Sequence, residues 1–405
     1  MDSVADILPF VDFSGLSFEE SISRVQLPFS EPHIYTREVL FELLKHAFSI
    51  KAEDVFLSVG YPASVMWSEG VHYLGTRPLH YQELGDLLND MLKDDNARLD
   101  LSRGSDRDFT YAIEIDRGTY LRFRVNVTGC LGPWQSDGLD ITFRPMGKCP
   151  PTLDELGIPI ELQNILTPKI GLILVCGPTG SGKTTLLDST IRKLATQPNG
   201  RRILTYYQPI ENDLHAIPNQ TGVIAQTEIN EFHGGHLQSF GLAGRNALRR
   251  HPHVIVYGEA RDRETIDAAV TSARTGHLVF TTTHTLSVDS AIPRMADEFG
   301  ENGRVRITNA LITSCRGIVH QRLLRRPTVG RAPVRSWLEM TQDIRSELIR
   351  TPIDALPRTM AKFVKERGRS LWDDACSQYE KGLIHDDEMV MLESEIKEEE
   401  ASHDR

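Results

Sequence analysis

A nine-residue stretch, Gly177–Thr185, constrains the fold of this chain more than any other feature of its sequence. It reads GPTGSGKTT and fulfils the pattern G-x-x-x-x-G-K-[ST]. The apolar run Leu172–Cys176 precedes it, and a helix-forming stretch, Thr184–Ala195, follows it. Glycines let the backbone of such a loop point successive N–H groups at one anion, and the helix N-terminus adds its positive dipole end. The sequence therefore predicts a phosphate-binding loop between a buried strand and a helix.

The residues of this loop are expected to hold ATP together with Mg²⁺. Lys183 should bridge the β- and γ-phosphates, and the hydroxyl of Thr184 should bind Mg²⁺. The other loop residues expected to contact the nucleotide are Gly177, Pro178, Thr179, Gly180, Ser181, Gly182 and Thr185. A glycine-rich turn that matches the pattern by chance is the alternative, and the predicted strand and helix on either side argue against it.

The composition excludes several other classes of protein. With 40% hydrophobic and 25% charged residues, the 405-residue chain is typical of a globular protein. Its five cysteines form no CxxC pair, so neither a disulfide scaffold nor a four-cysteine zinc module is expected. No apolar run approaches the ~18 residues of a membrane span, so no transmembrane segment is expected. The net charge of −11 argues against a nucleic-acid coat.

The pattern of apolar residues divides the chain into regions. Mixed helix and strand patterns occupy residues 36–150. Short apolar strands alternate with helices over 171–332, which indicates a mainly parallel sheet, and amphipathic spacing predicts helices over 333–385. The remaining regions are a lead-in at 1–35, a linker at 151–170 and a tail at 386–405. The tail contains nine acids and two bases, so a solvated helix or a disordered end is expected.

Two predicted strands end in polar residues that suit nucleotide chemistry. The apolar strand 254–257 is followed by Gly258 and Glu259, and Glu259 is expected to contact Mg²⁺ through a water molecule. A surface carboxylate at a strand end is the alternative interpretation. The strand 278–283 is followed by His284, which could sense the γ-phosphate or serve only as a structural hydrogen-bonding group.

A third strand leads to the candidate that would activate water. The strand 202–207 is followed by QPIEND, which contains Glu211 and Asp213. Ligands of α/β sheets bind at the carboxyl ends of the strands. Glu211 is therefore the preferred candidate to orient and polarise the attacking water, and Asp213 is the alternative.

Together these motifs resemble those of the secretion or traffic ATPase superfamily. This superfamily includes the PilT-like retraction ATPases of type IV pili and their relatives in Dot/Icm-type and IncI-type conjugative type IVB secretion. The similarity extends from about residue 36 to 395. Besides the loop, the segments that carry it are AEDVFLSVG at 52–60, RFRVN at 122–126, FR at 143–144, ILTYYQPIE at 203–211, HVIVYGEARD at 253–262, TGHLVFTTTHT at 275–285 and GRSLWDDACSQYEKGLI at 368–384.

The resemblance implies an α/β fold with a RecA-like P-loop ATPase core, preceded by an α+β PAS-like domain and followed by a helical C-terminal part. It also implies that a hexameric ring of identical subunits hydrolyses ATP on the cytoplasmic side of the inner membrane, associated with components of a secretion machine. No sequence-specific contact with nucleic acid is expected. Glu211 matches the family's catalytic Glu, and Glu259 matches its atypical Walker B acid. Arg124 and Arg144 match arginines that reach the nucleotide, and they are expected to neutralise charge on the γ-phosphoryl group.

Two departures from the family pattern distinguish between its branches. Tyr206-Tyr207-Gln208 replaces the segment in which the family carries its first Glu and its Asp, and the stretch 129–139 lacks the arginine of the pilus pattern. These departures favour a type IVB secretion or conjugative transfer system. Type IV pilus retraction is the alternative.

Two further classes of function stay open from the residues alone. Arg245, Arg249 and Arg250 form a basic patch on the predicted helix 239–250, which a DNA-dependent RecA-like motor could use. A solvated or subunit-facing helix surface is the simpler interpretation of that patch. The other class is a nucleotide-gated assembly factor without turnover, which measurable hydrolysis would exclude.

Overall fold

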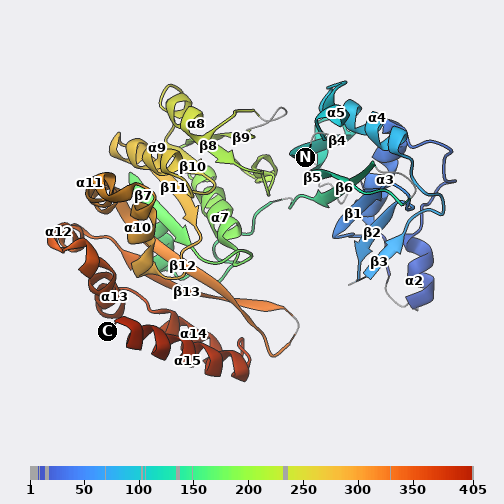
Figure 1. The fold of residues 1–405 in the computed structure, drawn as a ribbon. Coiled ribbons are helices and arrows are strands. Elements are labelled where there is room, and N and C mark those ends of the chain that lie inside the picture. Colours follow the sequence, from blue (N-terminus) through green and yellow to red (C-terminus); the bar gives the residue numbers. More distant parts are fainter. Residues whose placement is uncertain are drawn as a thin grey trace. The chain divides into compact units, whose positions relative to one another are not determined.

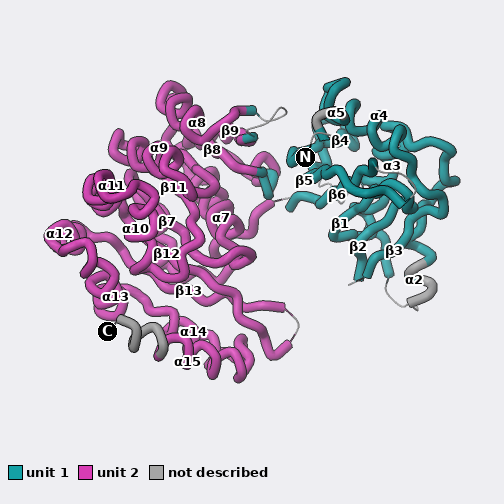
Figure 2. The backbone as a smooth tube through the Cα atoms, viewed as in Figure 1, with its two compact units in different colours: residues 1–147, 209–213, 230–236 teal, residues 148–208, 214–229, 237–405 magenta. Residues whose placement is uncertain are grey.

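The computed structural model shows that the chain folds into two compact units (Figure 2). It describes residues 8, 10–13, 18–68, 70–101, 104, 106–133, 137–147, 149–230, 236–328 and 330–403. Unit 1 comprises Met1–Gly147, Pro209–Asp213 and Asn230–His236. Unit 2 comprises Lys148–Gln208, Leu214–Ile229 and Leu237–Arg405. Two short segments of the second half of the chain therefore belong to the first unit.

Unit 1 is built on a six-stranded antiparallel sheet with the strand order β3-β2-β1-β6-β5-β4 (Figure 1). Its strands are β1 (Asp54–Ser58), β2 (Ser64–Trp67), β3 (Gly70–Tyr73), β4 (Asp106–Asp116), β5 (Thr119–Cys130) and β6 (Gly138–Pro145). Successive side chains of a strand point to opposite faces of the sheet. In β5, Leu121 and Phe123 are accordingly buried, whereas Arg122 and Arg124 between and beyond them are only partly buried. The apolar face closes the core and leaves the arginines on the other face.

In the described part of unit 1, the helices are α2 (Phe18–Val25), α3 (Arg37–Ser49), α4 (Tyr81–Leu92) and α5 (Ala97–Leu101). Helices α3 and α4 lie within residues 36–150, where mixed helix and strand patterns were predicted. Residues four positions apart share one face of a helix. Leu40 and Leu44 of α3 and Leu84 and Leu88 of α4 are accordingly buried in the same apolar cluster as the sheet.

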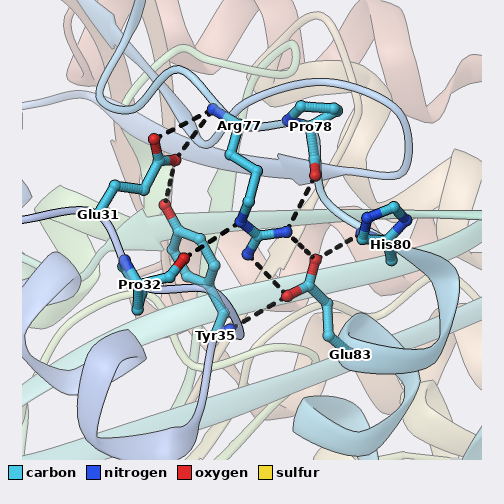
Figure 3. Close-up of polar contacts among 7 residues, drawn as sticks. All are labelled: Glu31, Pro32, Tyr35, Arg77, Pro78, His80 and Glu83. Atoms are coloured by element: carbon cyan, nitrogen blue, oxygen red, sulfur yellow. Dashed lines mark hydrogen bonds and ion pairs between the residues drawn. The ribbon is translucent and has the colours of Figure 1, made fainter.

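A cluster of charged groups joins residues 31–35 to the turn before α4 (Figure 3). Nη1 and Nη2 of Arg77 each donate to one carboxylate oxygen of Glu83 at 2.9 Å. The carboxylate of Glu31 accepts from the backbone N–H groups of Thr76 and Arg77 and from the hydroxyl of Tyr35. Burial by itself would raise the pKa of Glu83, but the hydrogen bonds from Arg77, His80 and Tyr35 lower it overall. The cluster is therefore built for ionised carboxylates.

Unit 2 contains a seven-stranded sheet with the order β13-β12-β7-β11-β10-β8-β9 (Figure 1). The strands are β7 (Gly171–Cys176), β8 (Arg202–Tyr207), β9 (Val223–Glu228), β10 (Val254–Tyr257), β11 (Leu278–Thr283), β12 (Cys315–Arg325) and β13 (Arg331–Glu339). All neighbours pair in parallel except β12 and β13, which form an antiparallel hairpin. The parallel sheet predicted from the alternation of strands and helices is confirmed.

Helices lie on both faces of this sheet. They are α6 (Ile160–Leu166), α7 (Lys183–Ala195), α8 (Phe240–Ala247), α9 (Arg263–Arg274), α10 (Val288–Asp297), α11 (Gly300–Ser314), α12 (Gln342–Arg350), α13 (Leu356–Arg367), α14 (Leu371–Glu380) and α15 (Asp386–His403), with 3₁₀ turns η1 (Leu214–Ala216) and η2 (Ile353–Ala355). Leu172 and Leu174 of β7 share one apolar cluster with α9, α10 and α11, so Ile173 and Val175 face the opposite side. In the described part of the chain, no helix combines the length and the apolar character needed to span a membrane.

The expectation of helices from residue 333 onward is wrong for its first part, because residues 331–339 form β13. Residues 334–338 are all buried. A strand covered on both faces shows no alternation of apolar and polar residues, so its sequence lacks the period that identifies a strand. The segments after it are helical, as α12, α13 and α14.

The acidic tail forms the helix α15, one of the two alternatives predicted. It is not fully solvated, because Leu392 is buried in an apolar cluster with Leu324 and Val334 of the β12–β13 hairpin. Nη1 of Arg322 also donates to Oε2 of Glu395 at 2.6 Å. One side of the tail therefore packs on the β12–β13 hairpin.

Candidate active site

The predicted loop joins β7 to α7 at the carboxyl end of the parallel sheet of unit 2. Its glycines Gly177, Gly180 and Gly182 have φ angles of 145°, 74° and 81°, a region that side chains with a Cβ rarely adopt. A Cβ on Gly177 would also lie 2.3 Å from the carbonyl oxygen of Gln321. The shape of the loop therefore requires glycine at these positions.

Lys183 is the first residue of α7, and its side chain folds back over the loop. Nζ donates to the carbonyl oxygens of Gly177 at 2.7 Å and of Pro178 at 2.9 Å, and the residue is 8% exposed. Both of these acceptors are neutral backbone carbonyl groups. The charge is thus held inside the loop, where a phosphate would meet it.

His284 connects Lys183 with Glu259. The strand β11 pairs with β7 up to Thr283 and Cys176, which brings the next residue, His284, beside the start of the loop. Nδ1 of His284 lies 3.4 Å from Nζ of Lys183, and Nε2 lies 3.3 Å from Oε1 of Glu259. An ammonium can only donate, so Nδ1 accepts and the proton of the neutral ring is on Nε2, facing the carboxylate. Three predicted site residues therefore form one continuous contact chain.

Close packing explains why a glycine, Gly258, precedes Glu259. Gly258 is held between its neighbours, because its N–H donates to Tyr206 at 2.7 Å and its carbonyl accepts from the hydroxyl of Thr282 at 2.7 Å. A Cβ on Gly258 would lie 2.6 Å from the ring of Tyr207. This close packing fixes the backbone from which Glu259 extends toward His284.

The residues of the loop fit a nucleotide phosphate and Mg²⁺. No acidic residue occupies the first turn of α7, so the positive end of its dipole is left for an anion. The hydroxyl of Ser181 is buried and has no hydrogen-bond partner in the described part of the chain. Thr184, in the same turn, and Glu259 offer oxygen ligands, which Mg²⁺ prefers.

The two predicted arginines belong to unit 1 and lie directly opposite each other on β5 and β6. Nε and Nη2 of Arg144 donate to the two carboxylate oxygens of Asp54, each at 2.7 Å. These hydrogen bonds raise the pKa of Arg144. The side chain of Arg124 has no hydrogen bond or ion pair with another described residue. The two arginines therefore differ in how freely they could contact a ligand.

Glu211 and Asp213, between which the sequence left a choice, lie in the segment Pro209–Asp213 of unit 1. Asp213 is engaged, because its carboxylate pairs with the guanidinium of Arg122 and its N–H donates to Gly147 at 3.2 Å. Glu211 is exposed and has no partner among the described residues. Of the two carboxylates, that of Glu211 is thus the one without a partner in the described part of the chain.

Two buried polar side chains beside the loop and α7 were not predicted. Nε2 of Gln321, on β12, donates to the carbonyl oxygen of Ser181 at 2.6 Å. The hydroxyl of Tyr207 donates to Oδ1 of Asp188, on α7, at 2.5 Å. The signal for Gln321 was a polar residue within the strand pattern IVHQRLL, and only the pairing of β12 with β7 shows what it faces.

A family model described as "Type II/IV secretion system protein" matches residues 151–398, which is more than half of the chain. Among curated proteins, the type IV pilus retractation ATPase PilT of Pseudomonas aeruginosa is 33% identical over 302 residues, covering 74% of this chain and 83% of that protein. The type IV pilus ATPase PilU of the same organism is 28% identical over 374 residues, covering 89% of this chain and 93% of that protein.

Solved structures agree with these matches. The X-ray structure of the Legionella pneumophila ATPase DotB has a TM-score of 0.85 and 32% identity, covering 91% of this chain and 99% of that one. The crystal structure of the pilus retraction motor PilT with bound ADP has a TM-score of 0.73 and 29% identity, covering 86% of this chain and 95% of that one. The predicted fold, an α/β RecA-like P-loop core preceded by an α+β domain, is confirmed.

Proposed function

Because this chain belongs to the type II/IV secretion ATPases, we propose that it hydrolyses ATP with Mg²⁺ and drives a type IVB secretion or conjugative transfer machine. The observation that carries the proposal is the contact chain in which His284 joins Lys183 of the glycine-rich loop to Glu259. A loop that only bound nucleotide would not need a carboxylate and a histidine at the ends of the two neighbouring strands.

The chain's own residues divide the tasks of binding. Lys183 and the backbone N–H groups of the loop hold the phosphates, and Thr184 and Glu259 hold the metal ion, Glu259 through a water molecule. When it is bound, Mg²⁺ neutralises charge on the β- and γ-phosphates. Nε2 of His284 lies 3.3 Å from Oε1 of Glu259, and this contact helps to keep that carboxylate in place.

Glu211 is the proposed general base. Its carboxylate is exposed and free of partners among the described residues, as is needed to accept a proton from water. Asp213 is bound to Arg122 and is better suited to a structural role. Arg124 and Arg144 are the proposed groups that stabilise charge on the transferred phosphoryl group. Removal of such an arginine costs on the order of 10³–10⁵ in rate in related phosphoryl-transfer enzymes.

The working assembly is proposed to be a ring of identical subunits, a hexamer, peripheral to the inner membrane on its cytoplasmic side. The TM-score of 0.85 with the Legionella pneumophila DotB, against 0.73 with the PilT motor, supports the secretion branch, whereas the Yersinia pseudotuberculosis DotB, at 0.71, does not separate the two branches. Pilus retraction is the second candidate, supported by the identity to PilT along most of the chain. Deleting the gene and scoring plasmid transfer and pilus-dependent motility separates the two.

The proposed chemistry is tested by phosphate release from ATP with the purified full chain. Lys183→Ala and Glu211→Gln should abolish turnover, and Glu211→Gln should still bind nucleotide. Glu161→Gln, which neutralises another exposed carboxylate, is the matched control and should hydrolyse ATP as the wild type does. Full activity of the Glu211→Gln protein would remove Glu211 as the base. A wild-type chain without turnover would contradict the proposed function itself.

A further inference from the structure

A buried chain of polar side chains connects the phosphate-binding loop with α14. Nε2 of Gln321 donates to the carbonyl oxygen of Ser181 at 2.6 Å, and Oε1 of the same side chain accepts from Nε of Arg335 at 2.7 Å. The backbone N–H of Arg335 donates to Oδ2 of Asp374, on α14, at 2.9 Å. Gln321, Arg335 and Asp374 are only 3%, 2% and 8% exposed. Water therefore has little access to these hydrogen bonds.

The chemistry of the partners fixes the orientation of the Gln321 amide. Arg335 has only donors, so the amide oxygen must face it. The amide NH₂ then faces the carbonyl of Ser181, which can only accept. A carboxylate could not donate to Ser181, and an apolar side chain could bind neither group. Glutamine suits this position because it accepts on one side and donates on the other.

Sheet register places Gln321 against the loop. His320 pairs with Cys176, the last residue of β7, so Gln321 lies level with the first residue of the loop. Its backbone and side chain crowd two of the loop glycines, because a Cβ on Gly177 would lie 2.3 Å from its carbonyl oxygen and one on Gly182 would lie 2.9 Å from Nε2. Arg335 lies directly opposite Gln321 on β13. The β12–β13 hairpin thus supports the loop from one side.

A buried arginine is not the most stable way to fill this space. Burial lowers the pKa of Arg335 to about 10, which still leaves the guanidinium charged at neutral pH. Buried ionic groups can often be replaced by apolar side chains of similar volume without loss of stability. A satisfied polar network does, however, hold its members in one arrangement. The arrangement here is that of the loop relative to the hairpin and α14.

Helix α14 also borders the candidate site from another direction. Trp372 and Asp373 of α14 line a cavity of about 1690 Å³ whose wall also includes His284. A shift of α14 would therefore change both the support of the loop and the surroundings of His284.

We propose that Gln321 is a positioning residue for the nucleotide-binding loop, and that Arg335 and Asp374 couple it to α14. Nucleotide binding then orders α14, and displacement of α14 weakens nucleotide binding, because coupling between two sites is reciprocal. This inference rests on the proposed function only in taking the loop as a nucleotide site.

The test measures binding of ADP with a fluorescent N-methylanthraniloyl label to the full chain below its melting temperature. Gln321→Glu keeps an acceptor for Arg335 but loses the donor to Ser181, so affinity should fall about tenfold or more. Asp374→Asn keeps an oxygen acceptor for the N–H of Arg335 but removes the negative charge at the α14 end of the polar chain. The affinity for labelled ADP should then fall at least about threefold. The matched control, Tyr257→Phe, removes the buried hydrogen bond between Tyr257 and Ser272 in the same unit and should bind as the wild type does.

Hydrogen exchange of the α14 amides, measured with and without ADP, distinguishes the proposed coupling from a purely structural role of these residues. ADP should slow exchange of the α14 amides in the wild type, and this protection should be lost in Gln321→Glu. The proposed coupling through Gln321, Arg335 and Asp374 would be overturned if Gln321→Glu and Asp374→Asn bound labelled ADP with wild-type affinity. It would also be overturned if their affinity fell only as much as that of Tyr257→Phe at matched stability. If the wild-type chain binds no labelled ADP, both the proposed function and the proposed coupling of the loop to α14 are wrong.

Discussion

The ammonium of Lys183 and the Nδ1 atom of His284 lie 3.4 Å apart, although the two residues are 101 positions apart in the sequence. The contact exists because β11 pairs with β7 along its whole length, so both strands end at the same edge of the sheet. Because His284 also contacts Glu259, a substitution at any of these three residues changes the surroundings of the other two.

Replacing His284 with Ala should lower the turnover number for ATP by about 10- to 100-fold, because Glu259 loses its 3.3 Å contact with the imidazole and keeps the longer one, at 3.8 Å, to Nε of Arg261. Affinity for labelled ADP should change by less than about threefold, since Lys183 keeps its place in the loop. Phosphate release and fluorescence titration measure the two effects. His277→Ala is the control at the other end of β11, where the ring contacts Ser272 and Thr275. Equal losses of turnover in both variants would contradict the assigned contact.

The buried His320 should make stability depend on pH. Burial, with the nearby charges of Arg322 and Lys183, lowers its pKa to about 4 from an ordinary value of 6.5. Below pH 6.5 His320 is therefore protonated in the unfolded chain but stays neutral in the folded chain. The free energy of unfolding is highest above pH 6.5 and falls as the pH is lowered toward 4. Between pH 7 and pH 5 the loss should be about 2 kcal/mol.

Urea unfolding at pH 7 and pH 5 measures this effect. His320→Gln, which cannot titrate, should flatten the pH dependence, whereas His33→Gln, at an exposed histidine, should leave it unchanged. An unaltered slope in the His320→Gln protein would show that other groups cause the acid sensitivity.

The pair of Arg77 and Glu83 should be important for the stability of unit 1. The side chain of Glu83 is only 6% exposed. Glu83→Gln leaves the guanidinium of Arg77 without its charged partner, so the free energy of unfolding should fall by about 3 kcal/mol. Glu393→Gln breaks an exposed pair with Lys397 and should cost less than about 0.5 kcal/mol. The lowered pKa values of Glu31 and Glu83 mean that their contribution is complete above the ordinary value of 4.5 and disappears as the pH falls below it. Comparable costs for the two variants in urea unfolding would contradict this assignment.

Arg124 and Arg144 should respond differently to substitution. Arg144→Ala leaves the carboxylate of Asp54, 11% exposed, without its partner, so the free energy of unfolding should fall by about 1–3 kcal/mol. Arg124→Glu should lower ATP turnover with little change in stability, because Arg124 has no partner to lose within the described residues. Thermal melts and phosphate release separate the two effects. Unchanged kinetics and nucleotide affinity in Arg124→Glu would show that this arginine does not act on the nucleotide.

Predictions from the sequence were most accurate where structure depends on near neighbours. The loop Gly177–Thr185, its strand and its helix were predicted together, because backbone freedom, strand burial and helix start are set by residues close in the chain. Strand β13 was missed, since burial on both of its faces removes the alternation that marks a strand. The sequence also did not reveal that Asp213 pairs with Arg122, whereas Glu211 has no partner among the described residues.

By itself, the sequence determined that a glycine-rich loop joins a buried strand to a helix, and which carboxylates and histidine follow the neighbouring strands. Only the tertiary structure decided that His284 bridges Lys183 and Glu259, and that Gln321 supports a loop residue 140 positions away. The physical reason is that a motif encodes local backbone geometry, whereas a hydrogen bond between distant side chains exists only once the pairing and register of the strands have brought them together.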